Sequence, residues 1–500
     1  MTRPTLFQVL LQERHWDGWV TFCARFEAAA RELAEETNSP HLADVTVSKR
    51  TFERWTSGNW HGRPWPDAAH VLEKLLGFSC ADLFRAAPDV MHAKAGVHDR
   101  GGLRASVLIG QRWPTSRLFV SATEDVADVW ELTGRQAMDG TTLAVQFNAA
   151  SRAGDVIHIH AADTRVLDQF LRPSRRGLVI GVDEGADGLD LYVVDSSNAR
   201  RARTSPSPGG ALSVPAAHLL DDLTYGLLWA LVQLDDGLLA DDRALDEEQP
   251  VLDTYLSLPR SAPSRMAVPD LTTVGAQWLG SAFCAQHIQR RLEGVSEPPV
   301  FWTREQTGEQ AAAWLFFRHK SDYLRALAAR YSGSATPLSR AFCIPETEVI
   351  RSSRYERILL FLAITLMEMH RIRVQVMVQP EYSAVDGFAL VPGQRAVVAN
   401  WVRTESIWAA DTVTQRQVLR EYHEAFAEAR SHSVMQGLDP ETRLRALAGY
   451  LDIQWPWLIR RCRELGEYGL ANLVRPRSRH LSVSALDDVL WFLASLVPDR

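Results

Sequence analysis

Apolar side chains recur at helical spacing through the first part of the chain, with no strand-like alternation. Phe22, Phe26, Ala29 and Leu33 are three or four residues apart, so they fall on one face of a helix. The segments with this spacing are residues 6–14, 16–36, 47–58, 66–77 and 79–84. The pattern predicts a small all-helical domain, which we place at residues 1–88.

Short runs of aliphatic and β-branched residues replace this pattern beyond a linker at residues 89–105. The runs are SVLIG, RLFVSAT, TTLAVQF, DVIHIHA, GLVIGVD and LDLYVVD. Polar turn residues bound each of them, which is typical of strands. We therefore expect an α/β region at residues 106–200.

The remaining chain divides by the same criteria. The stretch RRARTSPSPGGALSVP has linker composition and opens a mostly helical region at residues 201–299. Strands and helices alternate at residues 300–410, which indicates a sheet covered by helices, and residues 411–500 are helical again. We predict an α+β multidomain protein with an N-terminal all-α domain, a mixed α/β region and a helical C-terminal segment.

The stretch VSKRTFERWTSG, residues 47–58, is an amphipathic helix with two distinct faces. Ser48 is a suitable N-cap, and Val47, Phe52 and Trp55 form the apolar side, while Gly58 can end the helix. The outer face carries Lys49, Arg50, Thr51 and Arg54. Arginine can pair with guanine edges in a major groove, and free amides of a first helical turn can meet phosphate. The alternative is an ordinary surface helix that is basic.

Several ordered landmarks around this stretch resemble the helix-turn-helix domain of phage-repressor-like (Xre) regulators, of a subgroup common in GC-rich bacteria. They are ARELAEE, the S-x-x-T-φ-x-R-W-x-x-G pattern, and PDAAHVLEKLLG followed by ADLF, within Leu6 to Phe84. The resemblance implies binding to double-stranded DNA as a homodimer on two half-sites. One departure is the TNSPHLADVT segment before Val47, which is longer than the usual turn between the two helices.

The same resemblance implies roles for individual residues. Lys49, Arg50 and Arg54 would read bases, and Ser48 and Thr51 would contact phosphate or bases. His61 and Arg63 would contact a flanking phosphate.

Composition limits the classes of function. The net charge of −7 excludes a protein that coats nucleic acid indiscriminately, but residues 47–65 carry four Lys or Arg against one acid. No apolar run has the roughly 18 to 20 residues that span a membrane, and the N-terminus lacks a signal-peptide pattern, so we expect a cytoplasmic protein. The five cysteines are scattered, which favours reduced thiols over disulfides or a zinc site.

Catalytic and metal-binding motifs are scarce, so we expect no cofactor, no metal and no catalytic residue. His92, Lys94 and Asp99 match the H-x-K-x4-D motif of phospholipase D-like phosphodiesterases, but they lie in a linker and the usual second copy is missing. We interpret the match as a coincidence. A phosphodiesterase or nuclease targeted by the helical domain remains one alternative, and a protein-interaction module is another.

His158 and His160 share one face of a strand without a third ligand in view.

The larger part of the chain suits dimerisation, sensing of a small-molecule effector, or both. At residues 300–410 we considered a pocket near Trp302, Arg304, Trp401 and Arg403. Two charged stretches are expected mainly as solvated surface: the acidic DDGLLADDRALDEE and the basic RRCRELGEYGLANLVRPRSRH. The basic stretch is alternatively a second DNA contact or a dimer interface.

Overall fold

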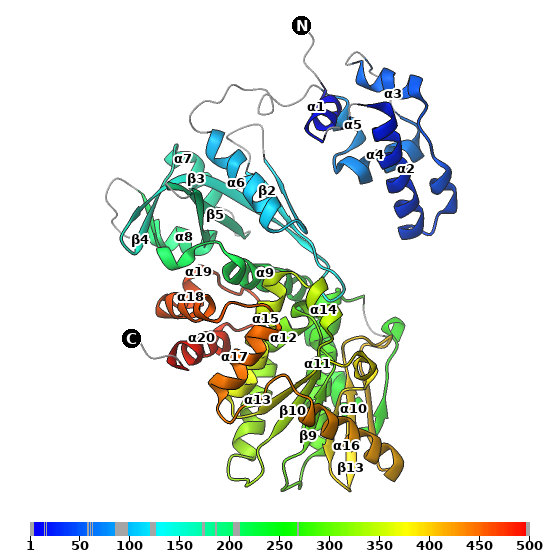
Figure 1. Ribbon diagram of the computed structural model, residues 1–500, viewed down its shortest axis with the longest axis vertical. Helices are drawn as coiled ribbons and strands as arrows, with labels where there is room; N and C mark the ends of the chain where they lie inside the picture. The colour runs from blue at the N-terminus through cyan, green and yellow to red at the C-terminus, as the bar shows by residue number, and fades with distance from the viewer. Residues whose placement is uncertain are drawn as a thin grey trace. The chain divides into compact units, whose positions relative to one another are not determined.

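A computed structural model describes residues 5–14, 16, 18–57, 60, 62, 64–85, 99–120, 127–172, 176–185, 188–203, 211–267 and 270–496. Two compact units account for the chain (Figure 1). The helical unit comprises residues 1–100 with 122–126, and the large unit comprises residues 101–121 and 127–500. The predicted α+β multidomain class, with a helical N-terminal region, is confirmed. No helix in the described part of the chain is both long and apolar enough to cross a membrane.

The helical unit consists of short helices around an aromatic core. Its elements are α1 (Leu6–Glu13), α2 (Trp19–Glu36), the 3-10 helix η1 (Pro40–Asp44), α3 (Lys49–Thr56), α4 (Pro66–Leu76) and α5 (Cys80–Leu83). Phe22 lies at the centre, with its ring centroid 4.9 Å from that of Phe52 and 5.7 Å from that of Phe7. The helical spacing of these residues is what brings them into one core.

The first sheet of the large unit has seven strands. They are β1 (Ser116–Phe119), β2 (Asp128–Leu132), β3 (Thr141–Ala153), β4 (Val156–His160), β5 (Gly177–Gly185), β6 (Gly188–Asp195) and β7 (Leu212–Pro215). The order β1-β2-β3-β4-β7 forms the main path, and β5 pairs with both β3 and β6. Along β5, Leu178 and Ile180 face one core while Val179 faces another with α7 (Thr164–Leu171) and α8 (Ser196–Arg203), as the two-residue period of a strand requires.

One strand prediction is wrong. The run SVLIG belongs to helix α6 (Asp99–Arg112), which also takes up the end of the predicted linker. Ala105, Ile109 and Trp113 are four residues apart and all buried against the first sheet. This spacing places the three side chains on one face of a helix, so the segment is helical. A short aliphatic run fits both the period of a strand and the period of a helix. The spacing from Ile109 to Trp113 is the feature that favours the helix.

The second sheet is mixed and also has seven strands. They are β8 (Arg260–Ser261), β9 (Val300–Thr303), β10 (Ser339–Cys343), β11 (Arg373–Met377), β12 (Phe388–Val391), β13 (Arg395–Asn400) and β14 (Ala409–Val413). Their order is β11-β10-β9-β12-β13-β14-β8, in which β9, β10 and β11 are parallel and the other pairings are antiparallel. Strand β14 extends the sheet slightly into the region predicted as helical.

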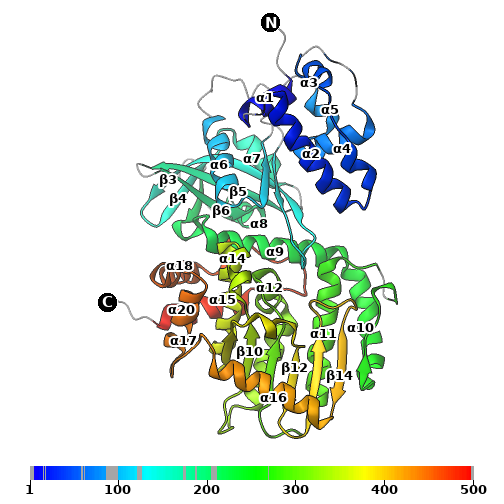
Figure 2. The ribbon, with the colours of Figure 1, turned by 45° about the vertical axis from the view of Figure 1, so that its right-hand side comes forward.

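Helices cover both faces of this sheet (Figure 2). Helix α16 (Arg416–Ser431) packs on one face, and α11 (Thr273–Arg291) and α15 (Arg354–Met369) pack on the other. The remaining helices are α10 (Asp242–Ser257), α12 (Gly308–Phe316), α13 (Arg318–Arg330), α14 (Glu346–Arg351), α17 (Pro440–Tyr450), α18 (Trp455–Tyr468), α19 (Leu470–Leu473) and α20 (Ser484–Leu496). The sequence predicts α12 and α13 as one helix, but Phe317 between them is extended and bridges to Leu481.

Helix α9 (Asp222–Ala240) lies between the two sheets. It contacts strand β3 of the first sheet. It also contacts α11, α12 and α15, of which α11 and α15 pack on the second sheet. Fourteen of its 19 residues are buried, so it is apolar around most of its circumference.

Candidate functional site

The N-terminal end of α3 is formed as the sequence predicts. Ser48 is the N-cap, with φ −69° and ψ 153°, and its Oγ accepts a hydrogen bond of 3.2 Å from the backbone N–H of Thr51. The hydroxyl groups of these two residues also lie 2.9 Å apart. The cap satisfies one amide of the first turn, and the helix begins at Lys49.

The apolar side of α3 fixes the helix in the unit. Phe52 and Trp55 are buried, and Val47 is buried beside them. The carbonyl of Val47 accepts hydrogen bonds from Trp19 Nε1 at 3.4 Å and from Cys23 Sγ at 3.2 Å. At the other end of α3, Gln8 Nε2 donates to the Thr56 carbonyl at 2.7 Å. Helices α1 and α2 thus hold both ends of α3.

The outer side of α3 gathers cationic and hydroxyl side chains. Ser48, Lys49, Arg50 and Arg54 are exposed, and Thr51 is half-buried. Lys49 Nζ lies 3.9 Å from the Glu53 carboxylate, a pair exposed enough for solvent to weaken it. The Arg54 guanidinium lies 5.4 Å from the ring centre of Trp60. Arg50 has no hydrogen bond or ion pair with any residue of the described ranges, so its guanidinium is available to a ligand.

Some predicted site residues lie outside the described residues. These are Gly58, His61, Arg63, His92 and Lys94, while Asp99 is described only as part of helix α6. Neither the flanking phosphate contact nor the phosphodiesterase-like motif therefore has a described geometry.

The long connection between α2 and α3 is an ordered element. Asn38 has a φ of 50° and starts a turn into η1, which packs along α2. Leu42 of η1 is buried. The connection thus folds back on α2, which accounts for its length and distinguishes it from the tight turn of the regulators that the sequence resembles.

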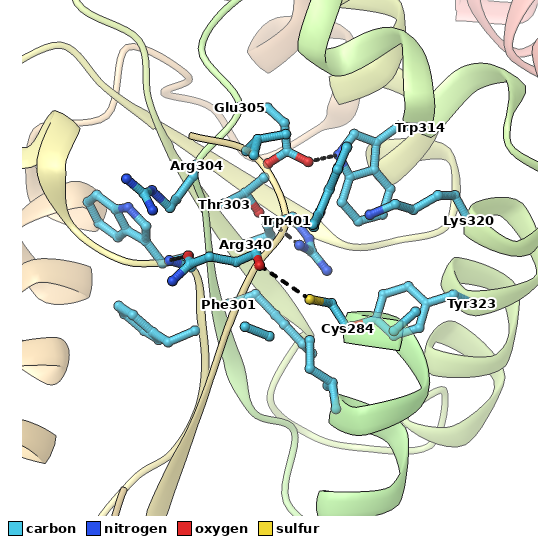
Figure 3. Close-up of a pocket in the computed structure, with 18 residues that line it drawn as sticks. Cys284, Phe301, Thr303, Arg304, Glu305, Trp314, Lys320, Tyr323, Arg340 and Trp401 are labelled. Atoms are coloured by element: carbon cyan, nitrogen blue, oxygen red, sulfur yellow. Dashed lines mark hydrogen bonds between the residues drawn. The ribbon is translucent and has the colours of Figure 1, made fainter. Parts of the chain in front are cut away.

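A second candidate site is a pocket of the large unit (Figure 3). It lies at the carboxyl ends of β9 and β13, beside the start of β12, with α11, α12 and α13 along its other side. Three residues named from the sequence, Trp302, Arg304 and Trp401, line it. Arg403 does not line it: its Nη1 donates to the Ser383 carbonyl at 3.0 Å.

The sequence did not indicate two of the three cations that line this pocket, Lys320 and Arg340. Lys320 comes from α13 and Arg340 from β10, so the topology alone brings them together. The available signal was that Lys320 is one of only four lysines in the chain and lies three positions after the apolar run WLFF.

The two strand histidines have ordinary partners. His158 Nδ1 lies 3.1 Å from Ser213 Oγ, and His160 Nε2 lies 2.9 Å from Ser151 Oγ. Among the described residues, no three histidine, cysteine or carboxylate side chains gather where they could hold a metal ion.

Ion pairs join the basic C-terminal stretch to the acidic stretch, and several other charged side chains of both stretches are exposed, as expected. Arg477 Nε donates to Asp235 at 2.9 Å, and Arg479 Nε lies 3.3 Å from Asp242. Arg461, with 3% of its side chain exposed, lies 2.6 Å from the Asp221 carboxylate. Arg461, Arg477 and Arg479 of this stretch are therefore engaged within the protein.

Comparison with known proteins yields no relative. No family model matches the chain, and no curated protein or solved structure matches it. Function is therefore inferred from the geometry of α3 and the pocket, together with the sequence resemblance of the helical unit.

Proposed function

We propose that this protein is a transcriptional regulator that binds double-stranded DNA sequence-specifically through α3. The observation that supports the proposal is the exposed N-terminal turn of α3. Lys49, Arg50 and Arg54 project from a helix that buried Phe52 and Trp55 hold in place. A rigid helix that presents cations and hydrogen-bond donors suits a major groove.

The exposed groups have complementary roles in this proposal. Arg50 and Arg54 contact base edges, where a guanidinium can donate two parallel hydrogen bonds to guanine. Lys49 and the free backbone amides of the first turn contact phosphate, and Ser48 and Thr51 stabilise that turn while offering hydroxyl groups to the DNA backbone. Phosphate contacts position the helix, and base contacts give the specificity.

The large unit contributes dimerisation and sensing. A single helix in one groove makes few contacts, so a homodimer on two half-sites supplies the remaining affinity. The proposal predicts a two-fold symmetric operator sequence.

The test is binding of genomic DNA fragments by the full-length protein at moderate salt, followed by sequencing of the retained DNA. We compare wild type with the Lys49→Ala/Arg50→Ala/Arg54→Ala variant. The matched control is Arg25→Ala/Arg31→Ala/Lys74→Ala, which removes the same charge from α2 and α4 of the same unit. We expect a discrete motif that wild type and the control retain and that the α3 variant loses.

Other outcomes contradict the proposal. Equal loss of DNA binding in both variants means that net charge alone attracts DNA. If the wild-type protein retains no sequence motif, the helical unit is a protein-interaction module. Affinity of a true DNA complex falls steeply with salt, because counterions are released from the phosphates. Metal-independent phosphodiester cleavage that His92→Ala abolishes would favour the enzyme alternative.

A further inference from the structure

Lys320 is a buried cation in the pocket of the large unit, and no carboxylate lies within ion-pair distance of it among the described residues. Only 3% of the residue is exposed, and its Nζ lies 3.8 Å from the ring centre of Trp314 and 4.3 Å from that of Trp401 (Figure 3). The ammonium makes no hydrogen bond or ion pair with any residue in the described part of the chain. Burial lowers the pKa of Lys320 to about 8, so the side chain still carries its charge at neutral pH.

Arg340 brings a second buried cation into the same pocket. The residue is 4% exposed, and its guanidinium lies 4.6 Å from the ring centre of Phe301 and 4.9 Å from that of Trp314. Its Nη1 donates to Thr303 Oγ1 at 2.8 Å, and the Tyr323 hydroxyl is a further hydrogen-bonding neighbour of the guanidinium, whereas Nε and Nη2 are buried and meet no acceptor with full hydrogen-bond geometry. These two nitrogens form the edge of a guanidinium that a carboxylate can meet with two parallel hydrogen bonds.

The negative charge that lines the pocket does not balance these cations. Glu305 is its one carboxylate among the described lining residues, and its Oε1 accepts a hydrogen bond of 2.7 Å from Trp314 Nε1. Arg304, a third lining cation, lies 3.5 Å from the Asp386 carboxylate. Buried charges and donors without partners cost free energy, and a bound anion would remove that cost.

We propose that this pocket binds a small oxyanion, a carboxylate or a phosphate group, between Lys320 and Arg340. The anion accepts two hydrogen bonds from Nε and Nη2 of Arg340 and one from the Lys320 ammonium. Trp314, Trp401 and Phe301 are the walls that exclude water and strengthen the charge interaction.

The size and position of the pocket agree with such a ligand. Its cavity volume is about 40 Å³, enough for a few water molecules or one oxyanion group. The space that includes the open mouth is about 470 Å³, so the rest of a small molecule can extend outward. The site lies at the carboxyl end of the parallel strand β9, and ligands of open α/β sheets commonly bind outside the carboxyl ends of the strands.

The experiment measures the thermal unfolding of the full-length protein against increasing acetate, benzoate or inorganic phosphate, with chloride at equal ionic strength as reference. Lys320→Met fills the same space without the charge, and Arg340→Met removes the free edge. Arg420→Met is the matched control, because Arg420 is exposed on α16, across the sheet. Circular dichroism establishes that each variant is folded.

We expect at least one of the three anions to raise the unfolding temperature of wild type and of the control. The apparent affinity should fall about tenfold or more in Lys320→Met and Arg340→Met, as the loss of a charged hydrogen bond predicts. A larger effect of phosphate than of the two carboxylates identifies a phosphate ligand, and the reverse identifies a carboxylate. Shifts no greater than those of chloride, or equal shifts in Lys320→Met and wild type, would overturn the proposal. DNA binding does not enter this measurement.

Discussion

The Asp235 carboxylate on α9 accepts hydrogen bonds from both the backbone N–H and the Nε of Arg477, at 2.8 and 2.9 Å. Asp235 is fully buried, and Arg176 Nη2 lies 3.1 Å from the same carboxylate. The C-terminal stretch is therefore attached to the helix that lies between the two sheets. Ion pairs join two charged stretches that look solvated in the sequence, and these pairs are buried at Asp235 and about half exposed at Asp242.

Asp235→Asn should destabilise the large unit by about 3 to 5 kcal/mol, because Arg176 and Arg477 would lose their shared buried partner. Urea unfolding followed by far-ultraviolet circular dichroism measures the change. Asp242→Asn is the control, since its pair with Arg479 is about half exposed and should contribute less than about 1 kcal/mol. Equal effects of the two substitutions would contradict this account.

Ser48→Ala should weaken α3 by about 0.5 to 2 kcal/mol, because the amide of Thr51 loses its acceptor. Hydrogen exchange of the α3 amides in the full-length protein detects the loss as faster exchange. Ser57→Ala removes a hydroxyl at the other end of the helix, where the side chain donates to the Arg54 carbonyl, and should change exchange less. Unchanged protection in Ser48→Ala would show that packing alone holds the helix.

Lys320→Met should stabilise the large unit at pH 7 by about 1 to 3 kcal/mol. Burial lowers the folded-state pKa of Lys320 from 10.5 to about 8, and each pH unit of displacement corresponds to about 1.4 kcal/mol. Contacts with Trp314 and Trp401 offset part of this cost. If Lys320 is buried in order to bind a ligand, replacing it should raise the stability of the protein and weaken ligand binding.

The stabilisation by Lys320→Met should depend on pH. The unfolded chain keeps the lysine proton up to about pH 10.5 whereas the folded chain loses it near pH 8, so the penalty is full below pH 8 and disappears as the pH rises to 10.5. The facing ionisable groups are Glu305, Arg340, Cys284 and Tyr323, and burial raises the pKa of Cys284 to about 12 and that of Tyr323. Denaturant unfolding of both proteins at pH 7 and pH 10 tests this. A constant difference would mean that packing, and not charge, causes it.

Arg50→Ala should cost about 1 to 3 kcal/mol on a specific DNA site if the side chain pairs with a guanine. Competition binding to operator variants would show relaxed preference at one base pair. A uniform loss on all sequences with a lower salt dependence would assign Arg50 to phosphate instead.

Local patterns predicted the local structure well. Helix α3 and its Ser48 cap follow from the spacing of Phe52 and Trp55 and from the polar residue before them. The run that became part of α6 was misread because five aliphatic-rich residues fit either period. Trp302 and Trp401 could be named as pocket residues because they end predicted strands.

Two of the three cations of the pocket, Lys320 and Arg340, could not be found in this way. Lys320 and Arg340 belong to elements whose neighbours in space are set by strand order and not by sequence distance. The same reason explains the ion pairs of the C-terminal stretch: the partners Asp235 and Arg477 are 242 positions apart. Single-sequence patterns contain no information about such pairings.

The burial of α9 between the first sheet and helices that pack on the second sheet has a consequence for how this protein can change over evolutionary time. A recombination event that replaced one sheet would leave one side of a nearly apolar helix in water, with no matching surface to cover it. Only a partner that evolved against the same helix can cover it. The helical unit has its own core and can be exchanged for another unit, whereas the two sheets must be inherited together.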